Sequence, residues 1–280
     1  MVNDLKIQEL KEKVFPLLRA RKRNDALQLI RSVESEALST LQWIGKDTDE
    51  RAEVFANACQ VFIHLEDGEP EKAVSFIDQA GDDEVSLGLL TISQIVVKEV
   101  GLPEGGGVPS TIDLCISLAE AGSKYALSKD SKKHAAMLNH NVAAFISPDF
   151  DDNIPQPLLE KGERAAVNSL EIRKEMGAPV GVSWGEWMVG IYSLAKGDGK
   201  AAIEHFSESS RVGDEIEEEK GRKTYVAWAN LYHGKTLAKL FPEKRDKGMK
   251  LMRKAHSLFK EIEDDWSIGH AESLLERFSK

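Results

Sequence analysis

Apolar residues recur with the period of an α-helix in segment after segment of this chain. They stand three, four and seven positions apart, as Ala58, Val61 and Leu65 do. No stretch alternates apolar and polar residues over six positions between turn residues, which is the pattern of a half-buried strand. The sequence therefore predicts an all-α protein with about thirteen helices.

Short segments rich in glycine, proline or polar residues separate these helices, among them GAPVG at 177 and KGDGK at 196. Several place a capping side chain directly before a helix, as Ser110 stands before Thr111. Helices of roughly 12 to 20 residues joined by short loops pack antiparallel to their neighbours. We expect about six antiparallel hairpins, followed by a capping helix from roughly Ser267 to Phe278.

The hairpins repeat with a period of about 40 residues, which is typical of a helical solenoid. The second helix of many units carries a small residue followed four positions later by a large apolar one. Such pairs are Ala26 and Ile30, Ala73 and Ile77, Ala202 and Phe206, and Gly248 and Met252. We expect a single solenoid over residues 1–280, with a soft division at 101–109, where three glycines form a flexible linker. The alternative is an irregular helical bundle.

The segment EWMVGIYSLAKGDGKAAIEHFSES at 186–209 resembles a tetratricopeptide repeat. That family has a small residue in the first helix, Gly-Asp at the turn, and a small and then an aromatic residue in the second helix. Here these places hold Gly190, Gly197, Asp198, Ala202 and Phe206. The other units depart from the consensus of about 34 residues in length and lack most of its Trp and Tyr positions. The chain is thus similar to a divergent tetratricopeptide-repeat protein, and the resemblance implies a right-handed superhelix of hairpins.

In tetratricopeptide proteins the first helix of each hairpin lines a concave groove. With the repeat register set by Gly190 and, in the next unit, by Ala229, the resemblance implies a set of groove residues. They are Trp184, Trp187, Lys223, Asn230 and His233. Aromatic area beside a cation and an amide suits the capture of an extended peptide or an acidic side chain. The alternative is that both tryptophans are ordinary packing between helices.

Two segments have the spacing of catalytic or nucleotide-binding motifs in a helical context. Residues 181–185, GVSWG, match a nucleophile elbow, but that motif needs a strand before the serine, and a helical segment precedes Ser183. Residues 233–236, HGKT, end like a phosphate-binding loop, but Ala229 stands where the first glycine should be. We therefore predict Ser183 in the first turn of a helix, no enzymatic activity and no cofactor.

Metal binding is not expected from the candidate ligands. Asp149, Asp151, Asn153 and Glu160 have the spacing of a calcium loop, but Ile154 stands where that loop requires glycine. The histidines show no paired spacing typical of a metal site. The two cysteines, Cys59 and Cys115, lie in helix-like sequence and are predicted to be core residues.

The chain carries 37 basic and 47 acidic residues, a net charge of −10, which argues against nucleic-acid binding. Residues 34–104 hold 16 acidic residues against 4 basic ones. Solvated helix faces explain this run, and a surface for a basic partner is the alternative. The sequence shows neither a leader segment nor an apolar run long enough to cross a membrane, so we expect a cytoplasmic protein without membrane contact.

Two classes of function remain open at this point. The first is a noncatalytic scaffold or adaptor that presents a groove to a protein or peptide partner. The second is a small-molecule sensor or enzyme built on the same scaffold, with a closed pocket near Trp184 and Trp187. An open groove would favour the first class and a closed pocket the second. Self-association is compatible with both.

Overall fold

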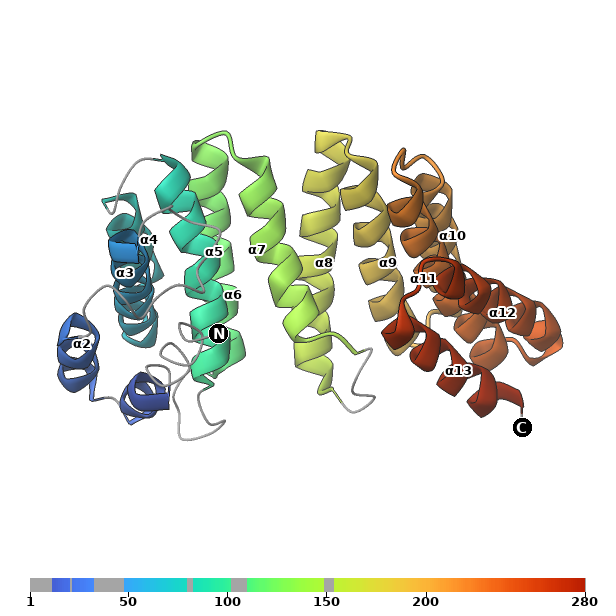
Figure 1. The fold of residues 1–280 in the computed structure, drawn as a ribbon, viewed down its shortest axis with the longest axis horizontal. Helices are drawn as coiled ribbons and strands as arrows, with labels where there is room; N and C mark the ends of the chain where they lie inside the picture. Colours follow the sequence, from blue (N-terminus) through green and yellow to red (C-terminus); the bar gives the residue numbers. More distant parts are fainter. Residues whose placement is uncertain are drawn as a thin grey trace. The chain divides into compact units, whose positions relative to one another are not determined.

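A computed structural model describes residues 12–20, 22–32, 48–79, 83–101, 110–148 and 154–279 of the protein. All regular secondary structure in these residues is helical, as expected from the apolar period. The contacts divide the chain into two compact units: unit 1, Met1–Leu138, and unit 2, Asn139–Lys280. Within each unit, consecutive helices run antiparallel to one another (Figure 1).

Unit 1 is built from helical hairpins. Its helices are α2 (Arg23–Ser32), α3 (Thr48–Glu66), α4 (Pro70–Asp78), α5 (Asp83–Val100), α6 (Thr111–Ser128) and the first part of α7 (Lys132–Phe145). Residues 12–19 are helical as well. Helix α3 packs against α4 and α5, and α5 packs against α6. The periodic residues Ala58, Val61 and Leu65 of α3 are all buried in this core.

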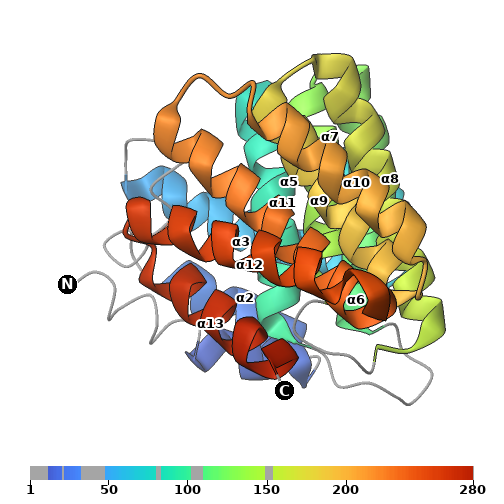
Figure 2. The same ribbon diagram turned by 90° about the vertical axis from the view of Figure 1, so that its right-hand side faces the viewer.

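Unit 2 continues the same pattern to the end of the described chain. Its helices are α8 (Gln156–Met176), α9 (Pro179–Ala195), α10 (Gly199–Gly213), α11 (Glu219–Leu240), the short 3-10 helix η2 (Pro242–Lys244), α12 (Arg245–Glu261) and α13 (Asp265–Ser279). Helices α9 and α10 form one hairpin, and α11 and α12 form the next. Helix α13 lies along α12, where the sequence predicts the capping helix (Figure 2).

Local signals in the sequence act as predicted at the helix ends and at the hairpin contact. The Ser110 hydroxyl accepts a hydrogen bond from the backbone N–H of Asp113, and the Asp113 carboxylate accepts one in return, which forms a capping box at the start of α6. A Cβ atom on Gly190 would lie only 2.7 Å from Phe206. Small residues are therefore required where α9 and α10 meet.

With residues 12–19 counted and η2 left out, the described residues contain thirteen α-helices, and these pack mostly on their sequence neighbours, which confirms the predicted all-α class. The proposed division at 101–109 falls almost wholly outside the described residues. So do Asp149, Asp151 and Asn153 of the calcium-like segment. The assignment of residues 1–280 to a single solenoid domain stays a prediction.

Candidate binding site

Aromatic side chains from three helices of unit 2 form one continuous cluster. Trp184 and Trp187 of α9 are stacked, with ring centroids 4.5 Å apart and planes 12° apart. Trp187 meets Trp228 and Tyr232 of α11 edge to face, at 5.9 Å and 5.4 Å. Trp228 in turn lies 5.7 Å from Trp266 of α13. We call this cluster, completed by His270, the aromatic row: Trp184, Trp187, Trp228, Tyr232, Trp266 and His270.

Burial varies strongly along the aromatic row. Trp187 is 5% exposed, and Trp228 and Tyr232 are buried beside it. Trp184 is half-buried, and Trp266 at the other end is 60% exposed while it stacks on His270 with planes 5° apart. The row is therefore a packed aromatic wall whose two ends offer ring surface to solvent. Such amphipathic rings are common at binding surfaces.

The buried middle of the row contains an unsatisfied donor. The indole N–H of Trp187 has no hydrogen-bond partner among the described residues, although its nitrogen is inaccessible to solvent. A buried donor without a partner costs about 1 to 3 kcal/mol, and folded proteins contain few of them. Trp187 thus carries both packing area and an unused hydrogen-bonding group.

The Trp184 end of the row is supported by a histidine. The Trp184 indole N–H donates a hydrogen bond to Nε2 of His140 in α7, at 3.0 Å. Burial lowers the pKa of His140 to about 4, and the nearby charge of Arg173 acts in the same direction. His140 is consequently neutral at neutral pH, and its Nε2 can accept the bond. Tyr225 of α11 covers another edge of Trp184, with ring centroids 5.8 Å apart.

The structure divides the predicted groove residues into two groups. Trp184 and Trp187 lie together in the row, but Lys223 and His233 have other neighbours. The Lys223 ammonium pairs with Glu219 at 2.7 Å and with Glu261 of α12 at 3.1 Å. His233 Nδ1 lies 3.5 Å from the hydroxyl of Ser207 in α10. Burial lowers the pKa of His233, which keeps this imidazole neutral.

Asn230 also points away from the aromatic row. It is two residues from Trp228, and two residues correspond to about 200° around an α-helix. Asn230 is 6% exposed, and its side-chain amide nitrogen has no hydrogen-bond partner in the described part of the chain. Lys223, Asn230 and His233 therefore occupy one side of α11, opposite the side that carries Trp228.

The repeat register explains this division. Gly190 marks the point where α9 meets the second helix of its hairpin, and Gly234 holds the same position in α11. A Cβ atom on Gly234 would lie 2.5 Å from a backbone oxygen of α12. The expected register used Ala229 instead, five residues too early. With Gly234 as the reference, Trp184 and Trp228 become equivalent, because each stands six residues before its glycine.

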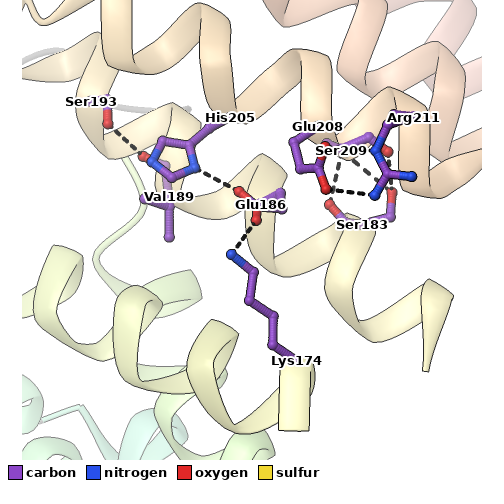
Figure 3. A network of polar contacts seen from close by, with 9 residues as sticks. All are labelled: Lys174, Ser183, Glu186, Val189, Ser193, His205, Glu208, Ser209 and Arg211. Carbon is purple, nitrogen blue, oxygen red and sulfur yellow. Dashed lines mark hydrogen bonds and ion pairs between the residues drawn. The ribbon is translucent and has the colours of Figure 1, made fainter. Parts of the chain in front are cut away.

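The side of α9 away from the row is held by a buried carboxylate (Figure 3). Glu186 is 2% exposed, and its two oxygens contact Nζ of Lys174 in α8 at 2.7 Å and Nδ1 of His205 in α10 at 2.6 Å. Burial alone would raise the pKa of Glu186, but the hydrogen bonds from His205 and Lys174 lower it below its ordinary value. One carboxylate therefore links three consecutive helices.

Ser183 lies in the same polar layer and has a structural environment. Its hydroxyl donates to the backbone oxygen of Ser209 at 2.9 Å, and the Ser209 hydroxyl donates to the backbone oxygen of Ser183 at 2.8 Å (Figure 3). Ser183 is fully buried near the start of α9, so its predicted helical placement is confirmed. The HGKT segment is likewise helical, within α11.

The two cysteine thiols lie outside this region and are structural groups. Cys59 and Cys115 are buried as predicted, and burial raises the pKa of each thiol to about 12.

Within the described ranges, no group of three His, Cys, Asp or Glu side chains could hold a metal ion. None of the helices described combines the length and the apolar character needed to cross a bilayer.

Comparison with known proteins places the chain by its fold. No family model matches the sequence, and no curated protein matches it. A crystal structure of a Rap protein complexed with competence and sporulation factor is similar, with a TM-score of 0.50. The similarity covers 99% of this chain and 85% of that chain at 12% sequence identity. At this identity it defines the class of fold alone: the protein is an all-α helical-repeat protein.

Sequence reasoning missed most of the aromatic row and all of the Glu186 contacts. The signal for Trp228 was present, since it repeats the position of Trp184 once the two glycines are aligned. No comparable signal marks Glu186, because its partners come from two other helices. Their convergence depends on how the hairpins stack.

Proposed function

We propose that this protein is a noncatalytic binding module of the tetratricopeptide type, which holds a protein or peptide partner along the aromatic row of unit 2. The observation that carries the proposal is the row itself. It joins exposed ring surface at Trp184 and Trp266 to a buried indole N–H, that of Trp187, which lacks a partner within the described chain. A bound chain could cover the exposed ring surface of Trp184 and Trp266 with its apolar side chains.

The geometry of the α9–α10 hairpin supports the tetratricopeptide assignment. Gly190 packs on Phe206 at the hairpin contact, and the Asp198 carboxylate caps α10 by accepting a hydrogen bond from the N–H of Ala201 at 3.0 Å. The similar Rap protein is complexed with competence and sporulation factor, so a helical-repeat fold of this kind can hold a bound factor. We also propose that the protein acts in the cytoplasm. The acidic residues of 34–104 would favour a basic segment of a partner.

A comparative capture experiment tests the proposal. Wild-type protein, Trp184→Ala and Leu127→Ala are each used to capture partners from the native cell, and proteins retained by the wild type but not by Trp184→Ala are identified. Leu127 is the matched control, because it is an exposed apolar side chain of unit 1, outside the row. The affinity of each purified partner is then measured by calorimetry.

Trp184→Ala is expected to weaken binding by about 1 to 3 kcal/mol, because an aromatic anchor of an interface is lost. Leu127→Ala should bind with the affinity of the wild type. Equal affinity of wild type and Trp184→Ala for every captured partner would remove the aromatic row from the binding site.

A further inference from the structure

Arg173, near the C-terminal end of α8, is a half-buried cation without a carboxylate partner among the described residues. Its Nη1 donates a hydrogen bond to the backbone oxygen of Gly181 at 3.0 Å. The guanidinium has five N–H donors, and this single acceptor occupies one of them. The contact ties the end of α8 to the start of α9 and leaves most of the hydrogen-bonding capacity of Arg173 unused.

Several other cations of unit 2 are paired with carboxylates. Lys174 contacts Glu186, Lys196 contacts Glu163, and Arg211 contacts both Glu208 and Glu215. The chain as a whole has 47 acidic residues against 37 basic ones, so carboxylates are abundant. A partly desolvated cation that lacks a carboxylate partner in these surroundings is a candidate for pairing with a group of another molecule.

The electrostatic surroundings of Arg173 favour an incoming anion. Burial lowers the pKa of Arg173, and the phenol of Tyr225 offsets only part of that effect. The guanidinium nevertheless stays charged at neutral pH, because its ordinary pKa is so high. A carboxylate placed against it would restore the favourable interactions that Arg173 lost with water, in a geometry that suits two parallel hydrogen bonds.

Exposed apolar side chains flank this charge. Met176 is 40% exposed and Val180 is 45% exposed. Arg173 and Met176 are three positions apart on α8, and Val180 and Trp184 are four positions apart on α9, so each pair shares one helix face. The hydrogen bond from Arg173 to Gly181 holds the two faces together. We call this area the corner surface: Arg173, Met176, Val180 and Trp184.

We propose that the corner surface binds an acidic amphipathic segment of a partner protein, whose Asp or Glu side chain pairs with Arg173 while its apolar side chains pack on Met176 and Val180. This inference rests on the proposed binding function and adds the chemical class of the partner. The occupant follows from charge complementarity, because a basic segment would be repelled by Arg173 and a purely apolar one would leave it unpaired.

Short peptides with blocked ends test this proposal. Two synthetic pools contain the same apolar residues and differ only in that one carries Glu and Asp where the other carries Gln and Asn. Both pools are passed over immobilised full-length protein as wild type, Arg173→Met, Arg173→Lys, Trp184→Ala and Arg211→Met, and the retained peptides are quantified by mass spectrometry. Arg211 is the matched control, because it is an exposed arginine of α10 that already pairs with two glutamates.

The wild type should retain the acidic pool about tenfold better than the amide pool, as expected for a charge-assisted pair. Arg211→Met should keep this preference, and Arg173→Met should lose it while its melting temperature stays close to that of the wild type. Arg173→Lys should recover part of the preference, because it restores the charge without the bidentate geometry.

Equal retention of the two pools by the wild type, or a preference that survives in Arg173→Met, would overturn the acidic-partner assignment. The proposed binding function is judged separately. Retention of the amide pool that disappears in Trp184→Ala would support that function even while the role of Arg173 fails. Retention of neither pool would contradict both.

Discussion

Two groups of side chains on α9 are packed in different ways. In the polar group, Glu186 and Ser183 are buried and their polar contacts are made by α8 and α10. In the aromatic group, Trp184 and Trp187 stack on each other, with ring surface exposed at Trp184 and one buried N–H unpartnered in the described chain. A satisfied polar layer holds neighbouring hairpins in one arrangement. An incompletely satisfied aromatic layer is where a ligand can still gain free energy.

The largest expected effect on stability is at the centre of the aromatic row. Trp187→Ala should lower the free energy of unfolding by about 3 to 5 kcal/mol, because it removes a buried indole that contacts three aromatic rings. Chemical denaturation monitored by circular dichroism measures the change. Even a small truncation of a buried side chain costs about 1 kcal/mol. A smaller loss in Trp187→Ala would therefore show that the row is not a packed core.

The hairpin contact should be the next most sensitive point. Gly190→Leu is expected to cost on the order of 2 kcal/mol or more, because even a Cβ atom at this position would crowd Phe206. Gly269→Ala is a suitable control, since a Cβ atom there meets nothing within 4 Å. If the two variants melted at the same temperature, the register of this repeat would have to be revised.

The polar side of α9 should show a pH-dependent effect. Glu186→Gln keeps the shape of the side chain but loses the charge that Lys174 and His205 stabilise, at a cost of about 1 to 2 kcal/mol at neutral pH. The pKa of Glu186 is lowered in the folded protein, so its contribution is present above the ordinary glutamate value of 4.5. As the pH falls below 4.5 this contribution decreases. It is fully lost once the pH has passed the lowered pKa of Glu186 in the folded protein.

Urea denaturation of wild type and Glu186→Gln at several pH values measures this effect. The difference in unfolding free energy should be constant near neutrality and shrink in acid. A difference that did not change with pH would mean that the carboxylate charge contributes nothing to the link between α8, α9 and α10.

The smallest effect is expected on the far side of α11. Lys223→Met removes two exposed ion pairs, which contribute little in water. Neither the melting temperature nor the affinity for a partner should change measurably. If Lys223→Met kept the stability of the wild type but clearly lost affinity for the partner, Lys223 would belong to the binding site.

Local features of this fold could be predicted from the sequence. The helices, the Ser110 cap and the contact between Gly190 and Phe206 all follow from patterns within a few dozen neighbouring residues. The candidate site could be predicted only in part. The family pattern predicts that Trp184 and Trp187 lie together, and in the structure they are stacked. The pattern puts Lys223 beside them only when Ala229 sets the register, and a small residue alone does not show which helix it meets.

Contacts between repeats escaped prediction for a related reason. The approach of Lys174 and His205 to Glu186 depends on the stacking of three helices, and helix stacking has no short-range signature in the sequence. The exposure of Trp266 is of the same kind. It depends on how α13 packs against α12 and α11.

Site-specific photo-crosslinking in the native cell shows directly which side of α11 and its neighbours a partner contacts. A photoreactive phenylalanine analogue replaces Trp266 at the exposed end of the aromatic row in one variant, and Lys223 on the opposite side of α11 in another. If the aromatic row binds the partner, we expect a discrete crosslinked partner from position 266 and none from position 223. A partner captured from position 223, with nothing captured from position 266, would contradict it.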